Sequence, residues 1–84
     1  VLREKAKEYQ KNKEFKKAEE LYKKIAEMSK MGFDYCAYGD ILYKHDKFSE
    51  AIKAYKEAIR LEPHAPYPKN AIEKVKRKQE GKNK

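Results

Sequence analysis

A recurrence every 33 residues constrains the fold of this chain more than any other feature of its sequence. Apolar or small residues near the start return 33 positions later as apolar or small residues. The pairs are Leu2 and Tyr35, Ala6 and Gly39, Phe15 and Phe48, Ala18 and Ala51, and Tyr22 and Tyr55. A period of about 20–50 residues is typical of repeat architectures, in which each unit buries its apolar face against its neighbour. The sequence therefore predicts two similar units lying side by side.

Within each unit the apolar residues follow the spacing of amphipathic helices, three or four positions apart. This spacing predicts helices over about 2–11, 14–30, 33–45 and 48–61. A fifth helix is expected to begin near Pro68 or Lys69, since proline is tolerated in a first helical turn.

The expected helix ends rest on weaker signals. Gly32 follows the second helix and suits the left-handed residue that ends many helices. No apolar residue follows Val75, so residues 79–84 are expected to fray.

Gly39 stands in the middle of the third helix, where glycine costs roughly 1 kcal/mol relative to alanine. The absence of a Cβ atom lets a second helix approach closely. We therefore expect Gly39 and Tyr55 to be buried where two helices meet.

The chain has 84 residues, enough for one domain, and carries a net charge of +8. Residues 1–30 hold ten bases and six acids (+4), residues 31–68 five and six (−1), and residues 69–84 seven and two (+5). Basic ends attract acidic peptides, nucleic acid or anionic lipid, although they also serve as solvated surfaces.

Enzymatic and metal sites are not expected. Cys36 is the only cysteine, so no internal disulfide forms, which suits a reducing compartment such as the cytoplasm. His45 and His64 lie in separate expected turns, with no spacing for a zinc cluster and no glycine-rich phosphate loop. No segment has the length and apolarity of a membrane span, and no cofactor is expected. The start at Val1 without methionine suggests a piece of a longer protein.

The second unit resembles the tetratricopeptide repeat, and the first unit resembles it more weakly. The residues that carry the resemblance are Gly39, Leu42, Ala51, Tyr55, Ala58 and Pro63. Tyr35 and Tyr38 depart from it, because the family has Trp and Leu there. The resemblance implies an all-α fold of antiparallel helix hairpins stacked as a short right-handed superhelix. The single domain then divides into a first repeat (1–32), a second repeat (33–65), a capping helix (66–80) and a frayed tail (81–84).

The resemblance also implies a concave groove, lined by the first helix of each hairpin, that binds a peptide or helix of a partner. Helical geometry places Phe33, Cys36, Asp40 and Tyr43 on one flank of the third helix. The same construction selects Arg3, Lys7 and Gln10 on the first helix. On the last helix it leaves two registers open, one with Lys69, Glu73, Lys76 and Arg77, the other with Tyr67, Asn70, Lys74 and Arg77. The expected site is Arg3, Lys7, Gln10, Phe33, Cys36, Asp40, Tyr43 and Arg77.

The expected function is an adaptor or scaffold that binds an acidic segment of a partner protein. Phe33 and Tyr43 are interpreted as exposed aromatic anchors, although both could instead pack against neighbouring helices. One alternative is a basic nucleic-acid-binding domain, for which residues 74–78 supply bases without interleaved aromatics. Another is an excised or engineered scaffold with no ligand. Weak self-association through Leu2 and Tyr9, or through Ile72 and Val75, is also expected.

Overall fold

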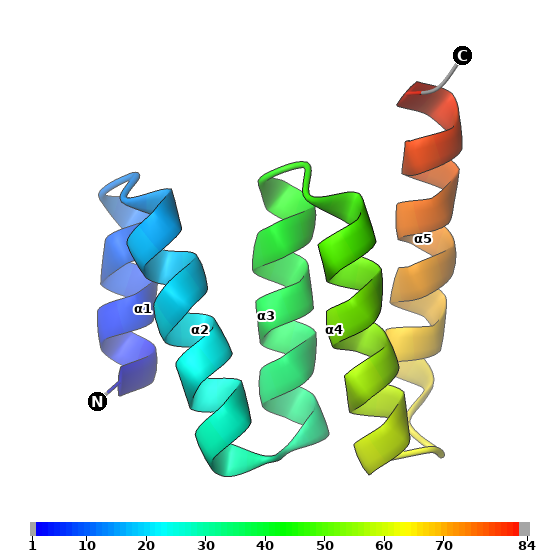
Figure 1. Cartoon of the computed structure of the whole chain (residues 1–84), viewed down its shortest axis with the longest axis horizontal. Coiled ribbons are helices and arrows are strands. Elements are labelled where there is room, and N and C mark those ends of the chain that lie inside the picture. Colours follow the sequence, from blue (N-terminus) through cyan, green and yellow to red (C-terminus); the bar gives the residue numbers. More distant parts are fainter. Residues whose placement is uncertain (1, 83–84) are drawn as a thin grey trace.

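The chain folds into a row of antiparallel helices joined by short turns (Figure 1). The structure is a computed structural model and describes residues 2–82. Its helices are α1 (Leu2–Lys11), α2 (Phe15–Ser29), α3 (Gly32–Lys44), α4 (Phe48–Leu61) and α5 (Pro66–Lys82). The residues 2–82 contain no strand. The expected all-α fold of stacked hairpins, α1–α2 and α3–α4, is confirmed, whereas the handedness of a superhelix stays a prediction.

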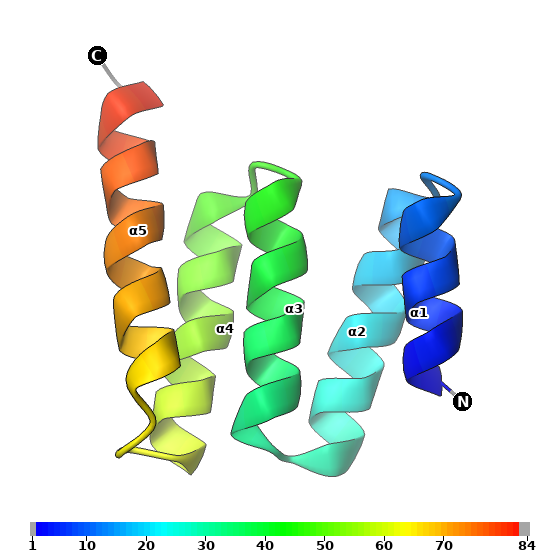
Figure 2. The same cartoon turned by 180° about the vertical axis from the view of Figure 1, so that it is seen from behind.

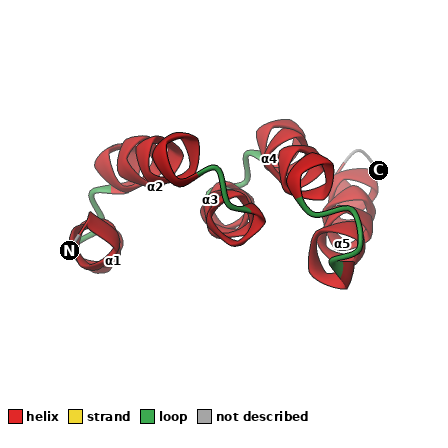
Figure 3. Cartoon of the chain, turned by 90° about the horizontal axis from the view of Figure 1, so that it is seen from below, coloured by secondary structure: helices red, strands yellow, loops and turns green. Residues whose placement is uncertain are grey.

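The helices alternate between two sides of the row. Seen from below, α1, α3 and α5 lie along one side and α2 and α4 along the other (Figure 3). The view from behind shows α1, α3 and α5 towards the viewer (Figure 2). Because α3 is set back between α1 and α5, this side forms a shallow concave face (Figure 3).

The expected helix boundaries are close to those observed, and the differences have local causes. Gly32 does not take the left-handed conformation; Lys30 does, with φ 53°, and its amide N–H donates to the Ala26 carbonyl at 2.9 Å. Gly32 instead begins α3 and lies next to the Glu62 side chain. Helix α5 begins at Pro66, earlier than expected, because a proline at the first helical position loses no hydrogen bond.

The predictions for the terminal helices α1 and α5 are confirmed only in part. Helix α5 continues to Lys82, so the expected fraying from Gln79 is wrong up to that residue, and positions 83–84 lie outside the described residues. Ile72 and Val75 are buried, so they offer no free surface for self-association. Leu2 remains exposed.

The main core lies where α4 packs between α3 and α5. Its buried residues are Leu42, Phe48, Ala51, Ala54, Tyr55, Ile72 and Val75. Gly39 lies against the ring of Tyr55, which is 2% exposed, and a Cβ atom on Gly39 would stand 2.8 Å from Tyr55 Cε1. The expected close approach at Gly39 is therefore confirmed.

Adding one methyl group at Gly39 should destabilise the protein. In an open helix, Gly→Ala stabilises by up to about 1 kcal/mol. In Gly39→Ala the clash with the buried Tyr55 ring should outweigh that gain and lower the free energy of unfolding by about 1–3 kcal/mol. Urea denaturation measures the difference.

Gly81→Ala is the matched control, since Gly81 is also helical but has no atom within 4 Å of its would-be Cβ. It should leave the free energy of unfolding unchanged or slightly raised. Equal stability of wild type and Gly39→Ala would contradict the role of the close approach.

Candidate functional site

A pocket of about 450 Å³ lies beside the N-terminal half of α3. Its lining comes from α3, the end of α4, the α4–α5 turn and the start of α5: Gly32, Phe33, Cys36, Ala37, Asp40, Ala58, Glu62, Ala65, Tyr67 and Pro68. We call it the α3–α5 pocket. It brings together three of the predicted site residues, Phe33, Cys36 and Asp40. Most of the lining is apolar, as in sites that take up an apolar side chain.

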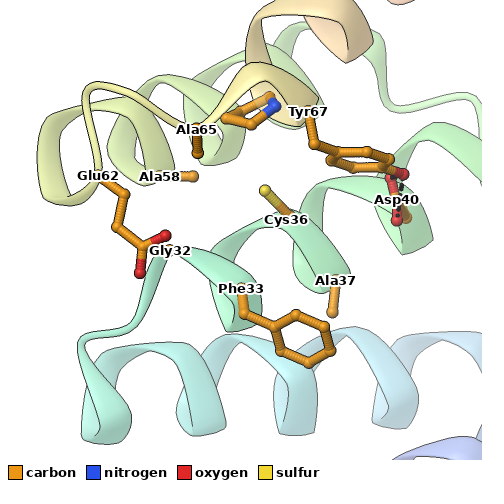
Figure 4. Close-up of a pocket in the computed structure, with 10 residues that line it drawn as sticks. Gly32, Phe33, Cys36, Ala37, Asp40, Ala58, Glu62, Ala65 and Tyr67 are labelled. Atoms are coloured by element: carbon orange, nitrogen blue, oxygen red, sulfur yellow. Dashed lines mark hydrogen bonds between the residues drawn. The ribbon is translucent and has the colours of Figure 1, made fainter.

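The small residues Gly32, Ala37, Ala58 and Ala65 leave the space that the pocket occupies. Figure 4 shows the Cys36 sulfur pointing from α3 towards Ala58 and Ala65. Phe33 stands at the rim and is 67% exposed, as the sequence predicted. An exposed phenylalanine beside an apolar recess is a suitable anchor for a partner side chain.

Asp40 holds the polar end of the pocket. Its carboxylate accepts hydrogen bonds from the Tyr67 hydroxyl, with Oη 2.9 Å from both carboxylate oxygens, and from the Tyr55 hydroxyl. Burial and these hydrogen bonds raise the pKa of Tyr67 to about 12 and that of Tyr55 further. Both hydroxyls therefore stay protonated near neutral pH and act as donors to Asp40.

The Cys36 thiol is poorly suited to nucleophilic chemistry. Burial and the nearby Asp40 and Glu62 carboxylates raise the pKa of the thiol to about 11. A reactive cysteine requires the opposite, a thiolate stabilised by positive charge. Cys36 therefore serves as a small, polarisable part of the pocket wall.

Tyr43 lies further along α3, in a smaller recess of about 180 Å³ that shares Asp40 and Tyr67 with the α3–α5 pocket. Of the two interpretations of Tyr43, an exposed anchor or a packed ring, the second is closer, because the residue is half-buried and its ring packs on Phe48, with 5.8 Å between centroids. The Lys74 ammonium also lies over the Tyr43 ring, 5.3 Å from its centroid.

This smaller recess also resolves the register of α5. Tyr67, Asn70 and Lys74 line it, which selects the second of the two open registers. Arg77 follows Lys74 by about one helical turn and is exposed. The two bases therefore lie beyond the pocket rather than inside it.

Arg3 already forms an ion pair within the protein. Its guanidinium donates two hydrogen bonds to Asp34, Nε to Oδ1 at 3.0 Å and Nη2 to Oδ2 at 2.6 Å. The Asp34 side chain is 3% exposed and the Arg3 side chain 53%. Burial alone would raise the pKa of the Asp34 carboxyl, but the pair with Arg3 holds it below its usual value. This bidentate pair joins α1 to α3 and occupies the base that the sequence assigned to a ligand.

Gln10 is engaged at the opposite end of α1. Its Oε1 lies 3.1 Å from His45 Nε2, while His45 Nδ1 contacts the Glu19 carboxylate. Lys47 Nζ donates to Glu19 Oε1 at 2.6 Å, and the Phe15 ring packs against His45 at 4.5 Å between centroids. These contacts join the α1–α2 turn to the α3–α4 turn. Lys7, between Arg3 and Gln10 on α1, is exposed.

Sequence reasoning missed Asp34 and Glu62 and included Tyr67 only in one open register. Asp34 lies in the first turn of α3, where an acidic side chain is ordinarily explained by its favourable interaction with the helix dipole. Glu62 and Tyr67 flank the turn with Pro63 and Pro66, whose path no helical periodicity predicts. Their part in the pocket depends on how α5 folds back on α3.

Removing the Arg3 guanidinium should destabilise the protein more than removing the Lys7 ammonium, which is also exposed. Arg3→Ala leaves the buried Asp34 carboxylate without a counter-charge, whereas Lys7→Ala leaves no buried charge unpaired. Chemical denaturation at pH 7 gives the ranking.

The same variants carry a pH signature. The pKa of Asp34 is depressed in the folded state, so the pair stabilises above the unfolded value of about 3.9 and ceases to do so as pH falls through the folded pKa. The difference between wild type and Arg3→Ala should therefore shrink in acid. A difference that is constant between pH 7 and pH 3 would contradict the pairing.

Cys36 should react slowly with a thiol reagent. A thiol pKa of about 11 leaves far less thiolate at pH 8 than the value of about 8.5 in an unfolded chain. Alkylation of the folded protein at pH 8 should be on the order of a hundredfold slower than in urea. Iodoacetamide rates followed by mass spectrometry test this, and equal rates in both states would contradict the assigned environment.

Within residues 2–81, whose side chains the structure describes, no three His, Cys, Asp or Glu residues gather as metal ligands. None of the helices described is long and apolar enough to cross a membrane.

Comparison with known proteins gives one finding. The family model described as tetratricopeptide repeat matches residues 33–65, which comprise α3, α4 and the turn that follows. No curated protein matches the chain.

Proposed function

Since the α3–α4 hairpin is a tetratricopeptide repeat, a motif of protein–protein interaction, we propose that the α3–α5 pocket binds a short segment of a partner protein. The observation that carries this proposal is the exposed Phe33 beside an apolar pocket of about 450 Å³. That volume lies within the range of about 300–1,000 Å³ common for ligand sites and suits one or two apolar side chains.

The proposed segment has an apolar anchor and acidic residues to one side of it. Asp40 and Glu62 are the charged groups of the pocket lining, so a carboxylate of the partner would be repelled there. Lys74 and Arg77 lie along the same face and can meet carboxylates one or two turns from the anchor. Arg3 is removed from the expected ligand contacts, because Asp34 already holds its guanidinium.

Affinity and rate should come from different groups. Each exposed ion pair contributes only about 0.2–1 kcal/mol, so the apolar anchor must supply most of the affinity. The chain's net charge of +8 instead speeds the encounter with an acidic partner and makes it sensitive to salt. Binding rather than catalysis also agrees with the raised pKa of Cys36, and its single thiol suits a reducing compartment such as the cytoplasm.

Nucleic-acid binding is the second candidate function, because of the bases on helix α5. This helix extends past the first turn of α4 (Figure 1), and its second half carries the exposed bases Lys76, Arg77 and Lys78. No aromatic residue accompanies these bases between Lys76 and Lys82, so single strands would have no stacking platform. Binding there would be electrostatic and independent of sequence.

The test is a calorimetric comparison of synthetic peptides with a leucine or methionine anchor followed by either acidic or basic residues. The acidic set should bind more tightly, and Phe33→Ala should weaken it by about tenfold. Met28→Ala is the matched control, because Met28 is 64% exposed, like Phe33, but lies on α2 away from the pocket.

Charge variants separate the two candidates. Lys74→Glu with Arg77→Glu should weaken the acidic peptide, whereas Lys53→Glu with Lys56→Glu, an equal change at exposed positions of α4, should not. Peptide binding that survives Phe33→Ala, together with oligonucleotide binding that is lost on reversing Lys76, Arg77 and Lys78, would replace the proposed function with the second candidate.

A further inference from the structure

The α1–α2 hairpin carries an apolar hollow of about 440 Å³ that the proposed function does not use. Its lining is Leu2, Lys5, Tyr9, Lys17, Glu20, Leu21 and Lys24. We call it the end face. Leu2 is 43% exposed, and Tyr9 and Leu21 are half-buried. The apolar floor is thus open to solvent within the described part of the chain.

The second hairpin shows what such a face accepts. Tyr35, Tyr38 and Leu42 stand 33 positions after Leu2, Lys5 and Tyr9. There α2 packs along α3, and Tyr35 and Tyr38 are half-buried, while Leu42 belongs to the core that α3 forms with α4 and α5. Burial, followed by nearby carboxylates that include Glu27 of α2, raises the pKa of both tyrosines. The counterpart of the end face is therefore covered by a helix that places acidic groups beside aromatic rings.

The charges around the end face differ from those of its counterpart. Lys17 and Lys24 stand where the second hairpin has Glu50 and Glu57, and Lys5 stands in place of Tyr38. Two of these lysines surround the aromatic floor, with Lys5 Nζ 5.3 Å and Lys17 Nζ 5.8 Å from the centroid of the Tyr9 ring. Glu20 is the acid in the lining. The end face is thus an apolar strip with a basic rim.

A second copy of the chain fits this face poorly. Two copies meeting face to face would bring Lys5, Lys17 and Lys24 of each against those of the other. A head-to-tail arrangement would need a free helix equivalent to α2, but α3 covers α2 and α5 covers α4. The rim favours an acidic occupant instead.

We propose that the end face binds an amphipathic helix of a partner protein, with an apolar stripe on Leu2, Tyr9 and Leu21 and carboxylates against the lysine rim. Helix α2 serves as the geometric template, since it covers the corresponding face of the second hairpin. This surface is separate from the α3–α5 pocket, so a partner can engage it while the pocket is empty.

The probe is a synthetic peptide with the sequence of residues 15–29, in which Lys16, Lys17, Lys23 and Lys24 are replaced by Glu. The matched control peptide keeps the same apolar residues and replaces Glu19, Glu20 and Glu27 by Lys. Fluorescence anisotropy of the labelled peptides with the whole chain measures both affinities. The acidic peptide should bind at least about tenfold more tightly and should lose affinity as salt rises.

Two variants locate the binding. Lys5→Glu with Lys24→Glu should weaken the acidic peptide about tenfold, while Lys53→Glu with Lys56→Glu on α4 should leave it unchanged. Leu2→Ser should weaken both peptides, because it removes apolar contact rather than charge. Phe33→Ala should have no effect, which distinguishes the end face from the pocket.

Any of four results with the peptides would overturn the proposal: equal binding of the two peptides, no binding of the acidic peptide up to about 1 mM, insensitivity to the end-face variants, or loss of binding in Phe33→Ala. Light scattering tests whether a second copy of the chain occupies the end face. A dimer that dissociates in Leu2→Ser would assign the end face to a second copy of the chain and overturn the partner helix.

Discussion

The contact between Gly39 and Tyr55 is the constraint on which both the packing and the pocket depend. The missing Cβ of Gly39 lets the Tyr55 ring lie against α3 and sets the separation of α3 and α4. The Tyr55 hydroxyl then reaches Asp40, which also accepts a hydrogen bond from Tyr67 at the start of α5. Asp40 on α3 therefore joins α4 and α5 through the hydroxyls of Tyr55 and Tyr67, and the α3–α5 pocket is the space that remains between the three helices.

Three acids of this basic chain are held by contacts within it. Asp34 pairs with Arg3, Glu19 contacts His45 and Lys47, and Asp40 takes two tyrosine hydroxyls. Burial would raise the pKa of the Glu19 carboxyl, but its bonds to Lys47 and His45 lower it, as Arg3 does for Asp34. Lysines on the outer surfaces exceed the exposed acids, so a partner meets a basic surface that contains the α3–α5 pocket and the end face.

Periodicity within the helices predicted the features that one helix decides by itself. The bounds of α1 and α4, the close approach at Gly39 and the grouping of Phe33, Cys36 and Asp40 on one flank all follow from positions along a single helix. The pairs Arg3–Asp34 and Gln10–His45 could not be predicted, since 31 and 35 residues separate the partners. They depend on how the first hairpin is placed against the second, which helical spacing does not specify.

The turns were harder to predict than the helices. Gly32 is permissive for a left-handed residue, but Lys30 takes that conformation and closes α2 with a bond to Ala26. For Tyr43 the sequence left two outcomes open, an exposed anchor or packing against a neighbouring helix, and the position of α5 puts Lys74 over its ring. The division of the chain into repeats of 1–32 and 33–65 with a capping segment stays a proposal.

Chemical-shift mapping tests the central claim most directly. The uniformly ¹⁵N-labelled chain would be titrated with an acidic peptide that carries a leucine anchor, and its backbone amide shifts followed by NMR. Binding in the α3–α5 pocket predicts that the largest shifts fall within residues 32–40 and 58–68, with smaller ones near Lys74 and Arg77. Shifts confined to residues 76–82, or to α1 and α2, would contradict the pocket as the site of partner binding.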